Sequence, residues 1–285
     1  YPYSDKDFMS DWPFAVMDEY PNFNIVGEEW SENPIVISYW QKDKINHDGY
    51  VSYLPTLMDF PLQISFTEAL LDDFNWGKGF IKPYKVLASD FLYPNPNNLL
   101  IFPDNHDMAR FYTQVKNDID LFKMGIVYYS TMRGIPQFYY GTEILMNSDE
   151  NPGDHGLIRT DFPGGWIGDK INAFNGDGLS IKQLETQKFF KQILNWRKNN
   201  NIIHNGKLIQ FAPKDGIYSF FRILENKMVW VIFNRNNSSK TLATSRFDEL
   251  IENHKSAFDV LNKKKISISE KLIINAKSAL ILEIE

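Results

Sequence analysis

The chain has 285 residues, of which 43% are hydrophobic and 23% charged, so its composition is that of a globular protein and excludes intrinsic disorder. The net charge is −6 without any basic run, which argues against nucleic acid as the main partner. The chain has no cysteine, which removes disulfides, thiolate catalysis and thiolate-bound metals. No apolar run approaches the roughly 18 residues that a membrane span needs.

In chain order, the first two thirds alternate short apolar runs with helix-like segments, a pattern typical of βα units around a parallel sheet. We expect strands at residues 23–27, 56–59, 99–102 and 135–140. Helices are expected at residues 7–20, 61–73, 117–133 and 182–199. In the third of these helices, Asn117 is the predicted N-cap and Gly134 the predicted stop. Residues 147–180 are rich in Gly, Asp and Pro, and we expect a long surface loop there.

After about Gly206 the pattern changes to short strands separated by turns. Strands are expected at residues 217–223, 228–233, 241–244 and 279–284, as in an all-β domain. We place the boundary between Asn201 and Gly206. The expected domains are therefore residues 1–204, with the βα units, and residues 205–285, with a β-sandwich.

Acidic residues follow two of the expected parallel strands. The first strand runs into Glu28-Glu29-Trp30, and the third runs into Pro103-Asp104-Asn105-His106-Asp107. Taken singly, Glu28 and Glu29 could begin a solvated loop, and Asp104 or Asp107 could cap the next helix. The carboxyl ends of barrel strands form one mouth, however, so we expect Glu28 and the His106-Asp107 pair to converge. Paired carboxylates are the apparatus of glycoside hydrolysis.

Four motifs in order resemble the α-amylase superfamily, particularly its neopullulanase and cyclomaltodextrinase branch. Residues 27–30 resemble the general-acid motif of that family, and residues 102–107 resemble its Asn-His-Asp motif on barrel strand seven. Residues 134–143, with the pattern Gly-x-Pro-x-x-Tyr-Tyr-Gly-x-Glu, resemble strand eight, and residues 155–166 resemble the loop that follows it. The resemblance covers nearly the whole chain and implies a (β/α)8 barrel with a C-terminal β-sandwich.

The resemblance also implies roles for individual residues. Glu28 would be the general acid and later the base, and Asp107 would bind ring hydroxyls and stabilise the oxocarbenium-like transition state. Further substrate-binding residues would come from the same motifs and from the loop after strand eight. In that loop the family often has an Asp four residues before an Arg, and this chain has His155 four residues before Arg159. The substrate-binding residues would be His106, Asn105, Arg159, Trp30, Tyr140 and Asp154. Packing is an equal alternative for Trp30 and Tyr140, whereas a metal-ligand role for His106 is poor because no second His lies at ligand spacing.

The nucleophile of the family, an Asp within Gly-x-Arg-x-Asp on strand four, has no counterpart in this sequence. Arg159-Thr160-Asp161 lacks the Gly and follows the other motifs, and Arg246-Phe247-Asp248 lies in the β domain. In relatives, a segment like Tyr1-Pro2-Tyr3 follows the nucleophile strand. We therefore expect this chain to hold barrel units five to eight and the C-terminal domain, and to begin within a longer polypeptide.

The sequence thus predicts part of a retaining hydrolase of α-1,4-linked glucans such as pullulan, cyclodextrins and maltooligosaccharides, inactive in isolation. A transglycosylase of the same fold and a non-enzymatic barrel with a binding role are the alternatives. Calcium is common in the family, but no ligand for it can be assigned here. The open edges of a half-barrel predict pairing with a second copy of the chain.

Overall fold

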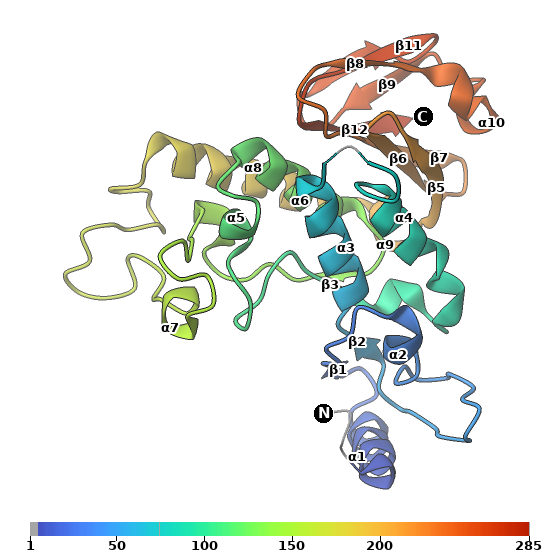
Figure 1. Ribbon diagram of the computed structural model, residues 1–285, viewed down its shortest axis with the longest axis vertical. Coiled ribbons are helices and arrows are strands. Elements are labelled where there is room, and N and C mark those ends of the chain that lie inside the picture. The colour runs from blue at the N-terminus through green and yellow to red at the C-terminus, as the bar shows by residue number, and fades with distance from the viewer. Residues whose placement is uncertain (1–4, 74, 285) are drawn as a thin grey trace. The chain divides into compact units, whose positions relative to one another are not determined.

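The computed structural model describes residues 5–73 and 75–284, so the segment Tyr1–Tyr3 lies outside the described residues. The chain divides into two compact units, which are drawn together in Figure 1. The first unit holds Tyr1–Phe102 and Arg133–Gln137, and the second holds Pro103–Met132 and Phe138–Glu285. The barrel-like strands belong to the first unit, and the C-terminal sheet belongs to the second.

Four short parallel strands form the centre of the first unit. They are β1 (Val26–Gly27), β2 (Thr56–Leu57), β3 (Leu100–Ile101) and β4 (Ile135–Pro136). β1 pairs with β2 and β3 with β4, and a parallel bridge between Met58 and Leu100 joins the two pairs. The strands therefore lie side by side in chain order, as in one half of a (β/α)8 barrel. This arrangement confirms the expected parallel sheet, although each strand is only two residues long where four to six were predicted.

Helices connect these strands. The first unit contains α1 (Lys6–Glu19), α2 (Pro34–Ser38), α3 (Phe60–Leu71), α4 (Ile81–Ala88) and the 3-10 turns η1 (Asp90–Leu92) and η2 (Pro96–Asn98). α1 and α3 confirm two predicted helices, whereas α2 and α4 were not predicted.

A buried ion-pair network fixes the region between β2, η1 and β4. Arg133 is 2% exposed and binds Asp59 at 2.6 Å and Asp90 at 2.6 Å and 2.8 Å. Asp59 is also the N-cap of α3, where it accepts the N–H of Leu62 at 3.1 Å. Burial raises the pKa of the Asp59 carboxyl despite the opposing effect of Arg133. The network is satisfied on both sides, which a buried charge requires.

The second unit contains the remaining helical segments of the described chain. They are α5 (Phe111–Gln114), α6 (Ile119–Thr131), η3 (Thr142–Ile144), α7 (His155–Ile158), α8 (Ile181–Lys198), α9 (Asn201–Asn205), η4 (Thr244–Phe247) and α10 (Asp248–Ile251). α6 and α8 confirm predicted helices, and residues 147–180 are irregular apart from α7 and a single bridge.

The predicted N-cap of α6 was wrong by one residue. Asp118, not Asn117, is the N-cap, and its carboxylate accepts the N–H groups of Asp120 and Leu121 at 3.0 Å and 3.2 Å. Asn117 has a φ of 58°, which belongs to the left-handed region and suits the preceding turn. Burial opposes ionisation of Asp118, but Lys277 at 2.6 Å and the helix N–H groups outweigh it and lower the pKa.

The C-terminal part forms an antiparallel β domain. Six strands lie in the order β10-β9-β12-β7-β6-β5, and β11 pairs with β8 in a second, two-stranded sheet. The strands are β5 (Lys207–Lys214), β6 (Ile217–Leu224), β7 (Lys227–Asn234), β8 (Lys240–Ala243), β9 (Ser256–Asp259), β10 (Lys264–Ser267), β11 (Lys271–Ile274) and β12 (Ser278–Ile284). The four predicted strands are confirmed as β6, β7, β8 and β12.

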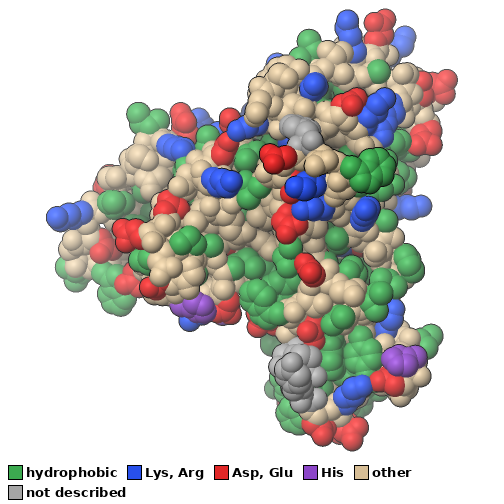
Figure 2. All heavy atoms as spheres, viewed as in Figure 1, with side chains coloured by type: hydrophobic (Ala, Val, Ile, Leu, Met, Phe, Trp, Pro, Cys, Tyr) green, Lys and Arg blue, Asp and Glu red, His purple; other side chains and the backbone are tan. Residues whose placement is uncertain are grey.

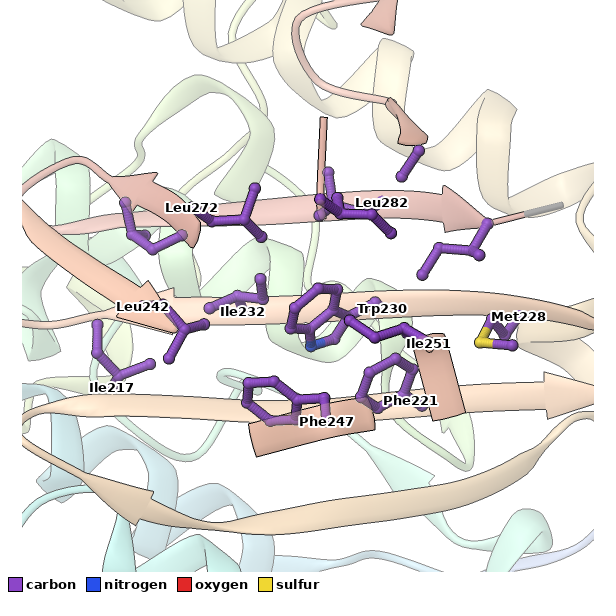
Figure 3. Packing of buried hydrophobic residues seen from close by; sticks show 14 residues of the cluster. Ile217, Phe221, Met228, Trp230, Ile232, Leu242, Phe247, Ile251, Leu272 and Leu282 are labelled. Atoms are coloured by element: carbon purple, nitrogen blue, oxygen red, sulfur yellow. The ribbon is translucent and has the colours of Figure 1, made fainter. Parts of the chain in front are cut away.

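Both faces of the large sheet are covered. On one face, Trp230 packs against Phe221 and Phe247, and side chains from both sheets complete this core (Figure 3). On the other face, Tyr128 of α6 contacts Phe220 and Phe233 with ring centroids 6.3 Å and 5.9 Å apart. This double burial explains why β6 and β7 read as nearly continuous apolar runs rather than as alternating patterns.

The outer strands of the parallel sheet each have one strand neighbour among the described residues. Val26 in β1 is 42% exposed and Ile135 in β4 is 37% exposed. Phe8 and Trp12 of α1 are also exposed, and hydrophobic side chains reach the surface over the part that holds α1 and β1 (Figure 2). The sheet therefore carries apolar surface at its ends.

Candidate active site

Glu28 directly follows β1, whose last residue, Gly27, lies close to β2 and to the segment before it. A Cβ atom at Gly27 would lie 2.8 Å from Cδ2 of Leu57 and closer still to Cδ2 of Leu54, so a larger residue here would require these side chains to move. Glu28 is partly exposed, and its Oε1 accepts the indole N–H of Trp30 at 3.0 Å. The structure thus places Trp30 beside the proposed acid. The Trp30 ring also packs on Phe60 at 4.2 Å and stays 52% exposed, and its role as a sugar platform remains a prediction.

The two adjacent glutamates have different environments. Glu29 is 5% exposed and accepts the indole N–H of Trp40 at 3.0 Å within the core. A solvated loop starting at both residues is therefore wrong for Glu29. Of these two glutamates, only Glu28 has an accessible carboxylate.

Glu28 lies at an apolar groove between α1 and β1. The groove has a volume of about 440 Å³. Its lining residues come from α1, from β1 with the residues beside it, and from the segment before β2: Phe8, Met9, Trp12, Ile25, Val26, Gly27, Glu28 and Leu54. The carboxylate of Glu28 is the only charged group among them. All of this lies within the first unit.

Asp107, the other predicted catalytic residue, is the centre of a charged cluster in the second unit. Its Oδ1 accepts from Arg159 Nη2 at 2.5 Å, and its Oδ2 lies 3.1 Å from His106 Nε2. Arg159 also donates from Nε to the backbone oxygen of His106 at 2.9 Å. Three predicted site residues, His106, Asp107 and Arg159, are therefore brought together. The carboxylate and imidazole are both partly exposed and can be reached by sugar hydroxyls.

Asn105 stabilises the turn that carries His106 and Asp107. It is 5% exposed, and its Oδ1 accepts the backbone N–H of Asp107 at 2.8 Å. Its Nδ2 is buried and has no hydrogen-bond partner among the described residues. Asn105 thus orients the backbone of Asp107, while its Nδ2 group makes no hydrogen bond to the described residues.

Asp104 has a structural role, which agrees in part with the predicted alternative that Asp104 or Asp107 caps the next helix. Its carboxylate is 1% exposed and accepts the N–H of Phe111, the first residue of α5, at 2.7 Å. Thr142 Oγ1 lies 3.3 Å from it. Burial raises the pKa of Asp104 to about 6, although the Phe111 N–H, Arg110 and Thr142 all favour the ionised form.

The loop after β4 brings two further predicted residues into the second unit. Tyr140 donates its hydroxyl to the backbone oxygen of Thr160 at 2.7 Å, and its ring is 39% exposed. Asp154 is the N-cap of α7, where it accepts the N–H groups of Gly156 and Leu157 at 2.7 Å and 3.2 Å. Its carboxylate is therefore engaged by the helix.

Two residues that contribute to this cluster were not predicted as site residues by the sequence analysis. His155 occupies the place where the family often has an Asp, and its Nδ1 lies 2.6 Å from Arg159 Nη2 and 3.7 Å from Asp107. Arg110 lies beneath the cluster and is fully buried. The only sequence signal for Arg110 was a basic residue three positions after the His-Asp pair.

Neither a metal site nor a membrane helix is found in the described chain. Across residues 5–73 and 75–284, no group of three or more His, Asp or Glu side chains is arranged to hold a metal ion. Among the helices of these same residues, none has the length and apolarity to cross a membrane.

The fold is that of a barrel half followed by an antiparallel β domain, and comparison with known proteins identifies the class. The model of the α-amylase catalytic domain matches residues 2–206, and the model of the cyclo-malto-dextrinase C-terminal domain matches residues 208–283. The chain belongs to the α-amylase family. Within it, the C-terminal match and the relatives place the chain in the neopullulanase and cyclomaltodextrinase branch, as the sequence motifs indicated.

Individual relatives agree with the family assignment. A cyclomaltodextrinase of Thermoanaerobacter pseudethanolicus is 24% identical over 92% of the chain and 40% of its own length. A cyclomaltodextrin glucanotransferase of Geobacillus stearothermophilus is 26% identical over 84% of the chain and 30% of its own length. The structure of the α-amylase from Geobacillus thermoleovorans, solved with acarbose, has a TM-score of 0.77 and 20% identity over 99% of the chain and 58% of that protein. The chain thus spans less than two thirds of the length of each of these relatives.

Proposed function

We propose that this sequence supplies the general acid and the sugar-binding carboxylate of an enzyme that hydrolyses α-1,4-glucosidic bonds with retention of configuration. Pullulan, cyclodextrins and maltooligosaccharides are the proposed substrates. The observation that carries the proposal is the pair of strand ends in a barrel half. Glu28 follows β1 with an accessible carboxylate, and Asp107 follows β3 within a cluster of His106 and Arg159.

The proposed roles follow from these surroundings. Glu28 protonates the glycosidic oxygen and then activates water, and the indole N–H of Trp30 keeps its carboxylate in place. Asp107 and His106 bind ring hydroxyls, and the hydrogen bond from Arg159 orients the Asp107 carboxylate toward the oxocarbenium-like transition state. Asn105, Tyr140 and Asp154 complete the proposed substrate-binding set.

Transglycosylation is a second candidate, favoured by the similarity to a cyclomaltodextrin glucanotransferase. In that reaction a sugar hydroxyl replaces water in the second step, and the same carboxylates act. Product analysis of the whole protein with maltoheptaose separates the two, because longer or cyclic products indicate transfer.

Replacing Glu28 with Gln tests the assignment of the acid in the whole protein that contains this sequence. The amide keeps the shape of the side chain but cannot donate the proton, so turnover of maltooligosaccharides should fall by about 10²–10⁴-fold while binding survives. Glu29→Gln is the matched control for folding, since Glu29 is buried against Trp40. Near-normal turnover of the Glu28→Gln enzyme would show that another residue is the acid.

A further inference from the structure

Arg110 is a buried charge that makes no hydrogen bond to any carboxylate of the described residues. Its side chain is 0% exposed, and its Nε donates to the backbone oxygen of Ile158 at 2.8 Å, while Nη1 donates to the backbone oxygen of Tyr140. Its Cζ lies 4.1 Å and 4.8 Å from the ring centroids of Tyr139 and Tyr140. Nη2 has no hydrogen-bond partner among the described residues.

Stability alone does not account for such a residue. A buried guanidinium loses its hydration, and neutral carbonyl groups compensate for this loss less well than a paired carboxylate would. Asp104 is close enough to feel the charge of Arg110 but does not bind it. A methionine of similar length would fill the space without this cost.

The positions of the two carbonyls suggest what the charge does. Ile158 directly precedes Arg159, which binds Asp107 and the backbone of His106. Tyr140 carries the exposed ring at the end of the loop after β4. Arg110 itself comes three residues after Asp107. Its guanidinium group therefore connects three segments of the candidate site, those of Asp107, Tyr140 and Ile158.

We propose that Arg110 is a positioning residue that sets the placement of Arg159 and Tyr140 relative to Asp107 for binding an α-glucan. This inference builds on the proposed function, because it assigns the glucan to the same cluster. Arg110 itself touches no sugar. Its loss should displace the backbone at Ile158 and Tyr140, so that Arg159 no longer meets Asp107 correctly.

The test compares Arg110→Met with Arg222→Met in the 285-residue chain. Arg222 is a matched control, since it is also 0% exposed and its guanidinium binds the backbone oxygens of Gly206 and Thr131 in the same unit. Two readouts are measured on folded protein: the affinity for maltoheptaose by calorimetry, and the NMR signal of the Arg159 Nε–H, assigned through its loss in Arg159→Lys. Arg110→Lys keeps the charge but lacks the guanidinium group, and it replaces Arg110→Met in the comparison if the methionine variant does not fold.

In Arg110→Met we expect an affinity lower by at least about tenfold and a shifted, faster-exchanging Arg159 Nε–H, because small displacements of binding groups are costly. In Arg222→Met, the affinity should change by less than about twofold and the signal should stay, because distant sites act independently. Arg110→Lys should lie between them. Equal losses in both methionine variants, or an unmoved Arg159 signal in the Arg110 variants, would overturn the proposal. If the unaltered chain binds no maltoheptaose, the proposed function fails for this chain, and the NMR signal alone decides whether Arg110 positions Arg159.

Discussion

At the scale of single residues, the sequence motifs located the groups that the structure leaves accessible, but not the groups that hold them. Glu28 and Asp107 follow strands in recognisable local patterns, so both could be predicted from neighbouring residues. His155 and Arg110 acquire their roles only when loops that are 30 to 50 residues apart in the chain meet. No local spacing contains that information.

The buried carboxyl of Asp104 predicts a pH-dependent contribution to stability. Its pKa of about 6 in the folded chain lies above the ordinary value of 3.8, so the folded state holds this proton more tightly than the unfolded state does. The favourable contribution is therefore complete below about pH 4 and is lost as the pH rises through about 6. Two pKa units correspond to about 3 kcal/mol.

Asp104→Asn isolates this effect because the amide does not titrate. The free energy of unfolding of the unaltered chain minus that of the variant should fall by about 3 kcal/mol between pH 4 and pH 7. Chemical denaturation at several pH values measures it, and all other titrating groups cancel in the difference. A difference that is independent of pH would mean that Asp104 ionises normally in the folded chain.

At the scale of elements, secondary structure was predictable where one pattern dominated. α6 has apolar residues at spacings of three and four, and β6 and β7 are strongly apolar. β5 and β9 to β11 were missed because their exposed faces carry lysines and serines and because three of them are only four residues long. The parallel strands were overestimated, since Ile25, Leu99 and Phe102 are buried beside β1 and β3 but lie outside the paired residues of these strands.

Gly125 in α6 shows how packing outweighs helix propensity. A Cβ atom at this position would overlap the ring of Phe111 in α5. Alanine is the better helix former by about 1 kcal/mol, whereas overpacking a core costs about 1–3 kcal/mol. Gly125→Ala should therefore lower the free energy of unfolding, by up to about 2 kcal/mol, instead of raising it.

Denaturant unfolding measures this change, with Gly153→Ala as the control because nothing lies within 4 Å of a Cβ atom there. Phe111→Leu provides the second arm. Leucine vacates the space that the ring occupies, so the added methyl group should cost less in the double variant than alone, which a double-mutant cycle detects. A Gly125→Ala chain more stable than the unaltered one would show that the two helices can move apart freely.

At the scale of the whole molecule, the barrel half predicts where Glu28 and His106-Asp107 meet. β1 and β3 are two positions apart in the same parallel sheet, so their carboxyl ends should lie about 10 Å apart at an interstrand spacing of about 4.8 Å. We therefore predict that the two carboxylates converge at one end of the sheet. The positions could be anticipated from motif order, because every βα unit returns the chain to that end.

The absence of cysteine from the chain makes this convergence directly testable. Glu28→Cys combined with His106→Cys should form an intramolecular bond with a short bifunctional thiol reagent. The control is the Glu28→Cys single variant, which can form only bonds between chains with the same reagent. Failure of the double variant to form an intramolecular bond would contradict the convergence.

The last prediction concerns the 285-residue chain as a purified polypeptide, which should not hydrolyse maltooligosaccharides. A retaining mechanism needs a nucleophile carboxylate roughly 5–5.5 Å from the acid, and no Gly-x-Arg-x-Asp motif precedes Glu28 in the sequence. The same chain should associate with a second copy, because β1 presents an unpaired edge among the described residues and Val26, Phe8 and Trp12 are exposed beside it. Val26→Lys, which places a charge on that edge, should then reduce the mass in solution to that of one chain. Hydrolysis by the purified chain would reveal an unrecognised nucleophile, whereas a monomer that is inactive and unaffected by Val26→Lys would contradict only the pairing of edges.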